Sequence, residues 1–253
     1  MQNVFAVYFS PTGTSKTGAE TIARAISPDA VSYDLTCLDA PAPAPFDADS
    51  LVVFSAPVYG GRLYEGFAAR LDALRGHDTP CIITVTYGNR HYDDALLEMS
   101  DIVQTNGFIP FAAAALVARH TYGEIQINRP DVNDLSQDQD FAIQALEKLQ
   151  QGSLKPISVP GNKPYREGGK RGQFYPLTND SCIQCGLCAR QCPVYAIDAQ
   201  NVSHVDENLC LSCFRCIRCC PVGAKNMDVP AYQAFAKAFS AKLSQRRENE
   251  YFL

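Results

Sequence analysis

Eight cysteines of this 253-residue chain stand in two runs that share the spacing C-x2-C-x2-C-x3-C, and a proline follows each run. The first run holds Cys182, Cys185, Cys188 and Cys192, and the second, 28 residues later, holds Cys210, Cys213, Cys216 and Cys220. Three thiolates in one tight loop can cap three irons of a cubane, while the fourth iron needs a ligand from elsewhere. The spacing therefore predicts two [4Fe-4S] clusters.

This segment resembles the bacterial two-[4Fe-4S] ferredoxin family over roughly residues 176–228. In two-cluster ferredoxins, the fourth cysteine of each run ligates the other cluster. The resemblance therefore assigns one cluster to Cys182, Cys185, Cys188 and Cys220, and the second cluster to Cys210, Cys213, Cys216 and Cys192.

Zinc binding and disulfide bonds are the alternative uses of these cysteines, and Cys219 is an alternative ligand. Paired CxxC steps also bind zinc, but a tetrahedral zinc site requires neither a third step nor a trailing Cys-Pro in each run. A disulfide framework needs a secreted chain, and we expect none, because residues 3–9 form an apolar run without a charged region or cleavage site. Cys219 is the alternative to its neighbour Cys220, but the register against Cys192 favours Cys220 and leaves Cys219 as a buried free thiol.

The composition changes along the chain. Nine of the eleven cysteines fall between residues 182 and 220, which predicts two domains. Residues 1–150 carry 9 Lys and Arg against 19 Asp and Glu, whereas residues 151–253 carry 13 against 8. Each cluster with its thiolates adds a charge of about −2, so the second half becomes nearly neutral, and no nucleic-acid recognition motif accompanies it. No apolar run of about 18 residues is present to span a membrane, and we expect a protein of the reducing cytoplasm.

A hydroxyl-rich turn at residues 10–15 follows the first apolar run. Residues 3–10 predict a buried parallel strand, and Ser15 caps a predicted helix that extends to about residue 27. Unpaired N–H groups and the positive end of the helix dipole favour a phosphate at such a turn. The turn has neither the lysine of an ATP-binding loop nor the pattern G-x-G-x-x-G. It resembles the phosphate loop of the flavodoxin family, [ST]-x-T-G-x-[ST]; a plain helix cap is the alternative.

Two further apolar strands, at 51–56 and 81–85, end in loops with glycine and tyrosine. In flavodoxin-like sheets, FMN lies outside the carboxyl ends of the strands. By resemblance, the turn would hold the FMN phosphate, and loops 57–62 and 86–93 would flank the isoalloxazine. Tyr59 or Tyr92 would stack on the ring unless they only pack at a loop edge, and Gly60 and Gly61 would let the backbone approach N5. The candidate FMN residues are Ser10, Thr12, Gly13, Thr14, Ser15, Pro57, Val58, Tyr59, Gly60, Gly61, Thr86, Tyr87, Gly88, Asn89, Tyr92 and Asp93.

The order of elements predicts an α/β fold. Strands at 3–10, 31–38, 51–56, 81–85 and 112–119 alternate with helices at 15–27, 66–75, 94–105 and 136–151, as in a flavodoxin-like, doubly wound, five-stranded parallel sheet. The proline-rich residues 39–50 are too few for the usual second helix, so one face of the sheet would be thinly covered there. His120, Cys37 and Cys81 belong to no pattern, and we expect structural roles for them.

The second half divides further. Residues 152–176 form a basic linker rich in glycine and proline, which is either a solvated connector or a segment whose cations lie along the acidic first half. The predicted domains are a flavodoxin-like FMN-binding domain at 1–151, this linker, a small α+β two-[4Fe-4S] ferredoxin domain at 177–229, and a C-terminal helix and tail at 230–253. Apolar residues at three- and four-residue steps predict that the helix covers 230–247, and it would pack on the first domain or on a second copy.

A flavodoxin-like domain in front of a two-cluster ferredoxin resembles the flavodoxin–ferredoxin fusion proteins over nearly the whole chain. The resemblance implies an electron-transfer iron–sulfur flavoprotein of anaerobic or facultative microbes. Clusters pass single electrons and FMN accepts one or two, so the protein would relay electrons between both clusters and FMN, in exchange with a partner protein or a small-molecule acceptor. The alternatives are an FMN-dependent reductase of a quinone or nitro compound and a redox sensor. No catalytic residue is predicted, and no nicotinamide fingerprint is present.

Overall fold

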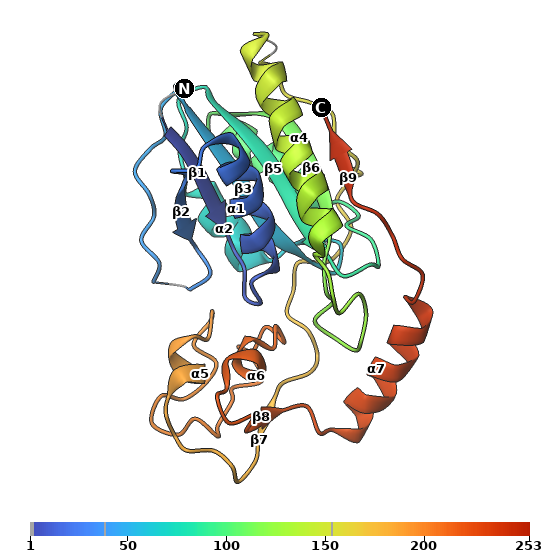
Figure 1. The fold of residues 1–253 in the computed structure, drawn as a ribbon. Coiled ribbons are helices and arrows are strands. Elements are labelled where there is room, and N and C mark those ends of the chain that lie inside the picture. Colours follow the sequence, from blue (N-terminus) through green and yellow to red (C-terminus); the bar gives the residue numbers. More distant parts are fainter. Residues whose placement is uncertain (1–2, 38, 153) are drawn as a thin grey trace.

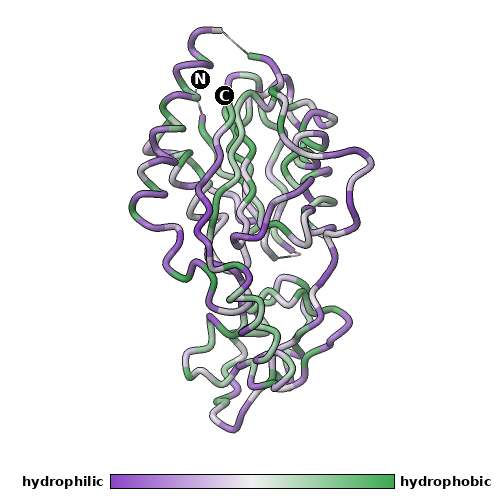
Figure 2. The backbone as a smooth tube through the Cα atoms, turned by 90° about the vertical axis from the view of Figure 1, so that its right-hand side faces the viewer, coloured by the Kyte–Doolittle hydropathy of each residue, from purple (hydrophilic) through white to green (hydrophobic). Residues whose placement is uncertain are grey.

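The computed structural model describes residues 3–37, 39–152 and 154–253. A sheet with helices on both faces forms the larger part, and the segment that bears the eight cysteines forms a smaller part at one end of it (Figure 1). Hydrophobic stretches gather in the middle of the larger part, and hydrophilic ones lie on its outer helices and loops (Figure 2). No helix in the described residues is both long and apolar enough to cross a membrane.

The sheet contains β1 (Asn3–Tyr8), β2 (Val31–Asp34), β3 (Ser50–Tyr59), β5 (Thr79–Tyr87) and β6 (Phe108–Val117), all parallel. Their spatial order is β2-β1-β3-β5-β6, which is the 2-1-3-4-5 order of flavodoxin-like sheets. The expected fold class is therefore confirmed. Strand β2 ends at Asp34, before the expected residue 38, which lies outside the described residues.

Helices cover both faces of the sheet. Helices α1 (Thr14–Ile26) and α4 (Val132–Gln150) pack on one face, whereas α2 (Glu65–Asp72) and α3 (Ala95–Thr105) pack on the other. Helix α4 begins at Val132 and not at residue 136, because the Asp131 side chain accepts hydrogen bonds from the backbone N–H groups of Asn133 (2.9 Å) and Asp134 (3.1 Å). This capping box starts the helix ahead of its first strongly apolar turn.

A phenylalanine takes the place of the helix that residues 39–50 are too few to form. Phe46 is 4% exposed, and its ring centroid lies 5.1 Å from that of Phe5 and 5.8 Å from that of Phe108. The edge-on and tilted arrangements of these rings are favourable for aromatic pairs. The sheet face that was expected to be thinly covered is therefore closed by aromatic packing.

The smaller part is an α+β unit whose two halves repeat each other. It contains β7 (Leu177–Thr178) paired with β8 (Lys225–Asn226), and the short helices α5 (Leu187–Arg190) and α6 (Arg215–Cys219). The same left-handed backbone conformation occurs 28 residues apart in three pairs, which are Gln184 and Ser212, Gly186 and Phe214, and Tyr195 and Gly223. The two cysteine runs therefore share their local fold as well as their spacing.

The C-terminal residues return to the sheet. Helix α7 (Pro230–Lys242) is shorter than the expected 230–247, and β9 (Glu250–Phe252) pairs antiparallel with β6 (Figure 1). The Asn89 amide fixes the chain between them, because it donates to the carbonyls of Leu243 (2.8 Å) and Gln245 (2.6 Å) and accepts from the N–H of Arg247 (3.0 Å). Strand β9 has only three residues, which are too few to show a periodic pattern, so the sequence analysis did not predict it.

The linker lies along the sheet part. Residues 154–176 contain no helix or strand, but the N–H groups of Asn162 and Arg166 both donate to the Asp94 carboxylate at 2.8 Å. Lys163 forms an ion pair with Asp101 (2.7 Å). Two cations of the linker, Lys163 and Arg166, therefore pair with the acidic first half of the chain, as the second interpretation expected, whereas Arg171 contacts the carbonyl of Glu207 in the smaller part.

Asp138 of α4 gives the contact with β9 a dependence on pH. The Tyr251 hydroxyl donates to its carboxylate (2.7 Å), and burial raises the pKa of Asp138 from 3.8 to about 7. A carboxyl with a raised pKa in the folded state contributes stability that is complete below pH 3.8 and is lost as pH rises towards 7. Asp138→Asn does not lose this stability, so its advantage over the wild type should grow as the pH rises between those limits. Urea unfolding at both pH values measures it. Exposed Asp140→Asn is the control, and equal gains at both pH values would contradict the prediction.

Candidate functional site

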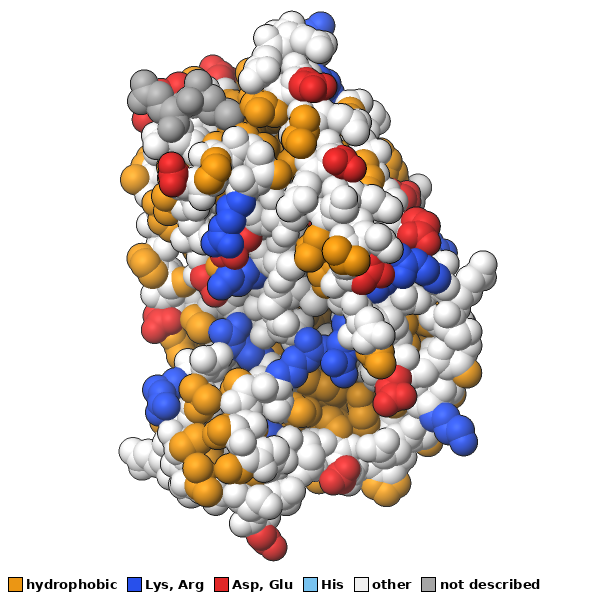
Figure 3. All heavy atoms as spheres, in the orientation of Figure 1, with side chains coloured by type: hydrophobic (Ala, Val, Ile, Leu, Met, Phe, Trp, Pro, Cys, Tyr) orange, Lys and Arg blue, Asp and Glu red, His pale blue; other side chains and the backbone are white. Residues whose placement is uncertain are grey.

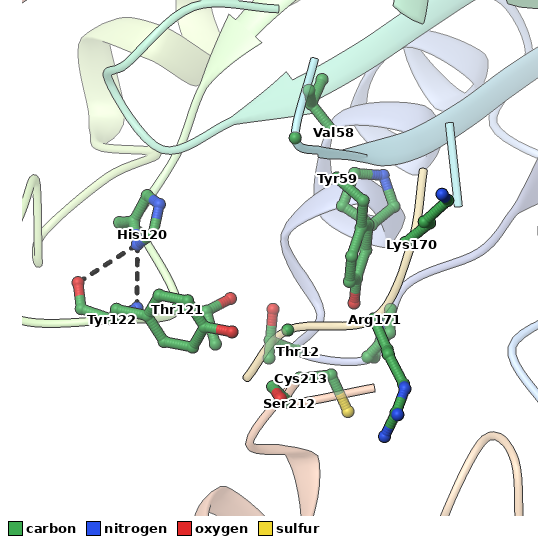
Figure 4. Close-up of a pocket in the computed structure, with 14 residues that line it drawn as sticks. Thr12, Val58, Tyr59, His120, Thr121, Tyr122, Lys170, Arg171, Ser212 and Cys213 are labelled. Carbon is green, nitrogen blue, oxygen red and sulfur yellow. Dashed lines mark hydrogen bonds between the residues drawn. The ribbon is translucent and has the colours of Figure 1, made fainter. Parts of the chain in front are cut away.

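A cavity of about 270 Å³ lies where the carboxyl ends of the parallel strands meet the smaller part. In Figure 4, Tyr59 lies on one side of it and His120 and Tyr122 on the opposite side, with Thr12, Ser212 and Cys213 below them. This is the edge at which open α/β sheets bind ligands. The lining residues are Pro11, Thr12, Pro57, Val58, Tyr59, Gly60, His120, Thr121, Tyr122, Lys170, Arg171, Gly172, Ser212 and Cys213.

A smaller cavity of about 60 Å³ shares Thr12 and Val58 with the first one and reaches Thr14 at the start of α1. Helix α1 has no side-chain cap, and Gly13 before it has a φ of 90°, which favours glycine. The turn is shaped by its own hydroxyls: Ser10 Oγ accepts from the N–H of Lys16 (2.9 Å), and Ser15 Oγ lies 2.5 Å from Thr86 Oγ1. An uncapped helix start beside a cavity fits a phosphate group.

The structure brings most of the predicted FMN residues together. Those that line the two cavities are Thr12, Thr14, Pro57, Val58, Tyr59, Gly60, Thr86, Tyr87 and Gly88. Ser10, Gly13 and Ser15 shape the turn beside them.

Four further predicted FMN residues, Gly61, Asn89, Tyr92 and Asp93, line neither cavity and do not belong to the turn. Tyr92 is 1% exposed and donates to the Glu250 carboxylate (2.9 Å), and the Asn89 amide holds the C-terminal chain. Asp93 forms an ion pair with Arg166 (2.7 Å), and Gly61 lies against Asp93, where a Cβ would overlap with its carboxylate. Strand β9 and the linker therefore engage the end of the 86–93 loop.

Sequence reasoning missed the loop after β6, which supplies His120, Thr121 and Tyr122. His120 Nδ1 accepts from the N–H of Tyr122 (2.8 Å), and burial lowers the pKa of His120 to about 4, so the ring is neutral at physiological pH. A Cβ on Gly88 would overlap with the His120 ring, so only glycine fits there. The available signal was position, because this loop follows a parallel strand and must lie at the same edge of the sheet as the other three.

Four cysteines surround a small enclosed cavity in the smaller part. They are Cys192, Cys210, Cys213 and Cys216, the set that the crossed assignment predicts for the second cluster. Within the described residues, no three His, Cys, Asp or Glu side chains converge on a single ion, but these four cysteines line the same cavity together with mostly apolar residues. Burial, with the nearby Cys192 and Cys210 thiols, raises the pKa of Cys213 to about 12. A buried thiol such as Cys213 ionises only if a cationic group binds it, which fits an iron–sulfur cluster.

The other set, Cys182, Cys185, Cys188 and Cys220, includes the exposed Cys185. Burial raises the pKa of Cys188, with a further contribution from Cys182. Burial would also raise the pKa of Cys220, but hydrogen bonds from backbone N–H groups hold it below its usual value. One of these, from Ala224 (3.2 Å), matches a bond from Ala196 to Cys192 (3.3 Å) in the first run. Such N–H···S bonds stabilise negative charge on the sulfurs and tune cluster potentials.

Cys219 stands apart from both sets. Its thiol donates to the carbonyl of Cys216 (3.6 Å), and burial raises its pKa. Cys219 does not line the enclosed cavity of the second set. Cys219 is half-buried and not buried as expected, and a free thiol remains the prediction for it.

Residues 181–224 match the family model of the 4Fe-4S dicluster domain. The chain is a fusion of a flavodoxin-like domain and a 4Fe-4S dicluster domain. A ferredoxin from Butyribacterium methylotrophicum is 51% identical to this chain over 35 residues, which are 14% of this chain and 62% of that protein. The chain thus spans less than two thirds of that relative.

The flavodoxin-like domain has counterparts among solved structures. Oxidised flavodoxin 2 from Bacillus cereus is 13% identical, with a TM-score of 0.43, over 58% of this chain and 99% of that one. A flavodiiron core from Synechocystis is 16% identical, with a TM-score of 0.42, over 60% of this chain and 36% of that one.

The dicluster domain contacts the hydroxyl-rich turn at residues 10–15 of the flavodoxin-like domain directly. Arg215 Nη1 of α6 donates to the carbonyls of Ser10 and Pro11, both at 3.3 Å. Arg218 Nη1, one turn along the same helix, lies 3.5 Å from the carbonyl of Thr12. Helix α6 carries Cys216 of the second set, so that set is held against the flavodoxin-like domain.

Proposed function

We propose that this iron–sulfur flavoprotein relays single electrons between its two [4Fe-4S] clusters and bound FMN, in exchange with a redox partner. The observation that carries the proposal is the position of Cys213. Its side chain lines the cavity between Tyr59 and Tyr122, and it also belongs to the second cysteine set. A ligand of one cluster would therefore form part of the wall of the flavin site.

The two kinds of group supply complementary chemistry when bound, since clusters pass one electron at a time and FMN takes one or two. The residues of this chain position them and set their surroundings. Burial raises the pKa of Tyr59 well above its usual value, so its hydroxyl stays protonated beside the cavity. Neutral His120 on the other side adds no charge. The walls formed by Tyr59 and His120 are therefore uncharged, and the cations of the lining are Lys170 and Arg171 of the linker.

We further propose that electrons enter or leave the protein at the first cysteine set. Cys185 is exposed, and the adjacent Ile183 side chain is 64% exposed. An apolar surface beside an exposed cluster ligand suits a protein partner that docks briefly. The partner would belong to the reducing cytoplasm, where such clusters are kept intact.

An anaerobic reductive titration of the reconstituted protein tests the relay. We expect about four electrons per chain, one for each cluster and two for the flavin, with the flavin bleaching at 450 nm, about the usual flavin maximum, alongside cluster signals in paramagnetic resonance. In Cys213→Ser, the flavin should still bind but should be reduced more slowly by a donor that reacts with the clusters. Equal rates in this variant and the wild type would contradict the proposed path.

A second groove favours the alternative function, reduction of a small molecule. It has a volume of about 560 Å³ and shares Lys170, Arg171, Gly172 and Ser212 with the flavin cavity. Phe174 and Tyr175 also line it, so cations and aromatic rings face the same space. A planar acceptor such as a quinone or nitro compound fits that chemistry. Steady-state turnover with a quinone, compared with turnover by a partner ferredoxin or flavodoxin, would decide between the two.

A further inference from the structure

We propose that the flavin site is shared between the two domains: Tyr122 and Ser212 complete the ring cavity, and Arg218 together with Arg119 completes the phosphate site. The inference rests on the proposed function, since it takes FMN as the ligand. Two of these residues, Ser212 and Arg218, belong to the dicluster domain. It follows that flavin binding and the docking of the dicluster domain stabilise each other.

Tyr122 is both a wall of the cavity and a contact between the domains. It follows β6 in the flavodoxin-like domain, and it lines the cavity opposite Tyr59 (Figure 4). Its ring also packs on Phe214, with centroids 5.3 Å apart, and on Tyr232, with centroids 6.2 Å apart. An aromatic ring that stacks on a ligand and on the second domain must respond to both. Removing it would loosen the ligand and the docked domain together.

Ser212 offers a hydroxyl to the cavity. The residue is 2% exposed, and its Oγ has no hydrogen-bond partner within the described part of the chain. The Tyr122 hydroxyl lies nearby, since both side chains border Gly172. Gly172 of the linker makes room, because a Cβ there would overlap with the Tyr122 hydroxyl. A buried hydroxyl without a partner costs free energy, and a polar ligand in the cavity would satisfy it.

Arg218 and Arg119 place two cations beside the phosphate turn. Arg119 lines the smaller cavity with Thr14, and Arg218 reaches the carbonyl of Thr12. Both arginines therefore lie beside Thr12, which lines the smaller cavity as well. Neither arginine is in an ion pair across residues 3–37, 39–152 and 154–253. Lys and Arg side chains also lie along this junction on the face drawn in Figure 3. Two neighbouring cations without a counter-ion fit a phosphate, which arginine binds strongly.

The coupling between the two sites is reciprocal by thermodynamic necessity. If docking of the dicluster domain raises the affinity for flavin, bound flavin strengthens docking by the same factor. The loss of one charge-assisted hydrogen bond, worth about 1.5 to 3 kcal/mol, corresponds to a roughly tenfold to hundredfold weaker affinity. The effect of each residue should therefore be measurable by flavin fluorescence.

The experiment compares FMN with riboflavin, which lacks the phosphate, on the full chain with both clusters assembled. Arg218→Gln should raise the dissociation constant of FMN about tenfold or more and leave that of riboflavin within about twofold. Tyr122→Leu should weaken both ligands about tenfold, whereas Tyr122→Phe keeps the ring and should restore most of the affinity. Ser212→Ala should weaken both to a smaller extent. The matched control is Arg24→Gln, an exposed arginine in the last turn of α1.

A second measurement on the wild-type chain does not depend on any variant. Amide hydrogen exchange of peptides around residues 211–218 should slow when FMN is added, while peptides around Cys185 should not change. Unchanged affinities in Arg218→Gln and Tyr122→Leu, or unchanged exchange around residues 211–218 with FMN bound, would overturn the shared site. A wild-type chain that binds neither FMN nor riboflavin would instead overturn the proposed function. Iron content identifies any variant whose domains fail to form.

Discussion

Cys192→Ser is expected to lose the same cluster as Cys213→Ser, and each variant should keep about half of the wild-type iron. The two residues come from different runs, but both line the enclosed cavity that Cys210 and Cys216 complete. Each cluster needs four thiolates, and loss of one ligand leaves an open iron that is readily released. Iron analysis and paramagnetic resonance of the reduced proteins would check this, because the two variants should show one identical remaining signal.

Two variants of the other predicted set test the same crossed assignment from the opposite side. Cys220→Ser and Cys185→Ser should both lose the other cluster, which is farther from the flavin cavity, and should keep the signal that Cys192→Ser loses. Cys219→Ser is the control, since its thiol bonds only to the Cys216 carbonyl, and it should keep both clusters. If Cys192→Ser matched Cys185→Ser, the fourth ligands would not cross between the runs.

Arg129→Met is expected to lower the free energy of unfolding by about 3–5 kcal/mol, because it leaves the buried Asp134 carboxylate with only the exposed Arg246 guanidinium, 3.7 Å away. Arg129 is 4% exposed and Asp134 is 1% exposed. The guanidinium donates to both oxygens of Asp134, to the Asn249 side chain (3.2 Å) and to the carbonyl of Arg247. The same cation therefore holds the start of α4 and the approach to β9. Urea unfolding of the anaerobic protein would measure the loss.

The matched control for that loss is Arg246→Met. Arg246 forms ion pairs with Asp131 (3.2 Å) and Glu248 (3.0 Å) and a longer one with the same Asp134 (3.7 Å), but its side chain is 42% exposed. Exposed pairs are worth about 0–1 kcal/mol, so this variant should unfold close to the wild type. Similar losses in the two variants would show that burial does not set the strength of the Arg129 pair.

The parts of this molecule that local sequence determines were predictable. The two cysteine runs indicated their own chemistry, because spacing alone decides whether three sulfurs can cap a cubane. The order of apolar strands and helices predicted the flavodoxin-like fold class, which is confirmed by the strand order. The turn at residues 10–15 could be recognised because a helix start and its hydroxyls are contiguous in the chain.

The parts of the molecule that depend on contacts between distant residues were not predictable from the sequence. Tyr92 and Tyr59 follow strands in the same way, but Glu250 of the returning tail binds the Tyr92 hydroxyl and keeps it out of the cavity. Tyr122 faces the cavity only because Phe214 and Tyr232 of later segments hold its ring. Phe46 has no helical pattern, and only the tertiary structure shows that it covers the sheet. In each case the deciding partner lies too far along the chain for any local pattern to indicate it.

The strand β9 also limits how the two halves can move. The chain leaves the sheet after α4, passes through the dicluster domain and is bound again beside β6. The cluster-bearing half is thus anchored at both of its ends, unlike a module at the end of a single flexible tether. Electrons that cross between the halves would therefore pass through a fixed interface, and neither half would have to move between docking positions.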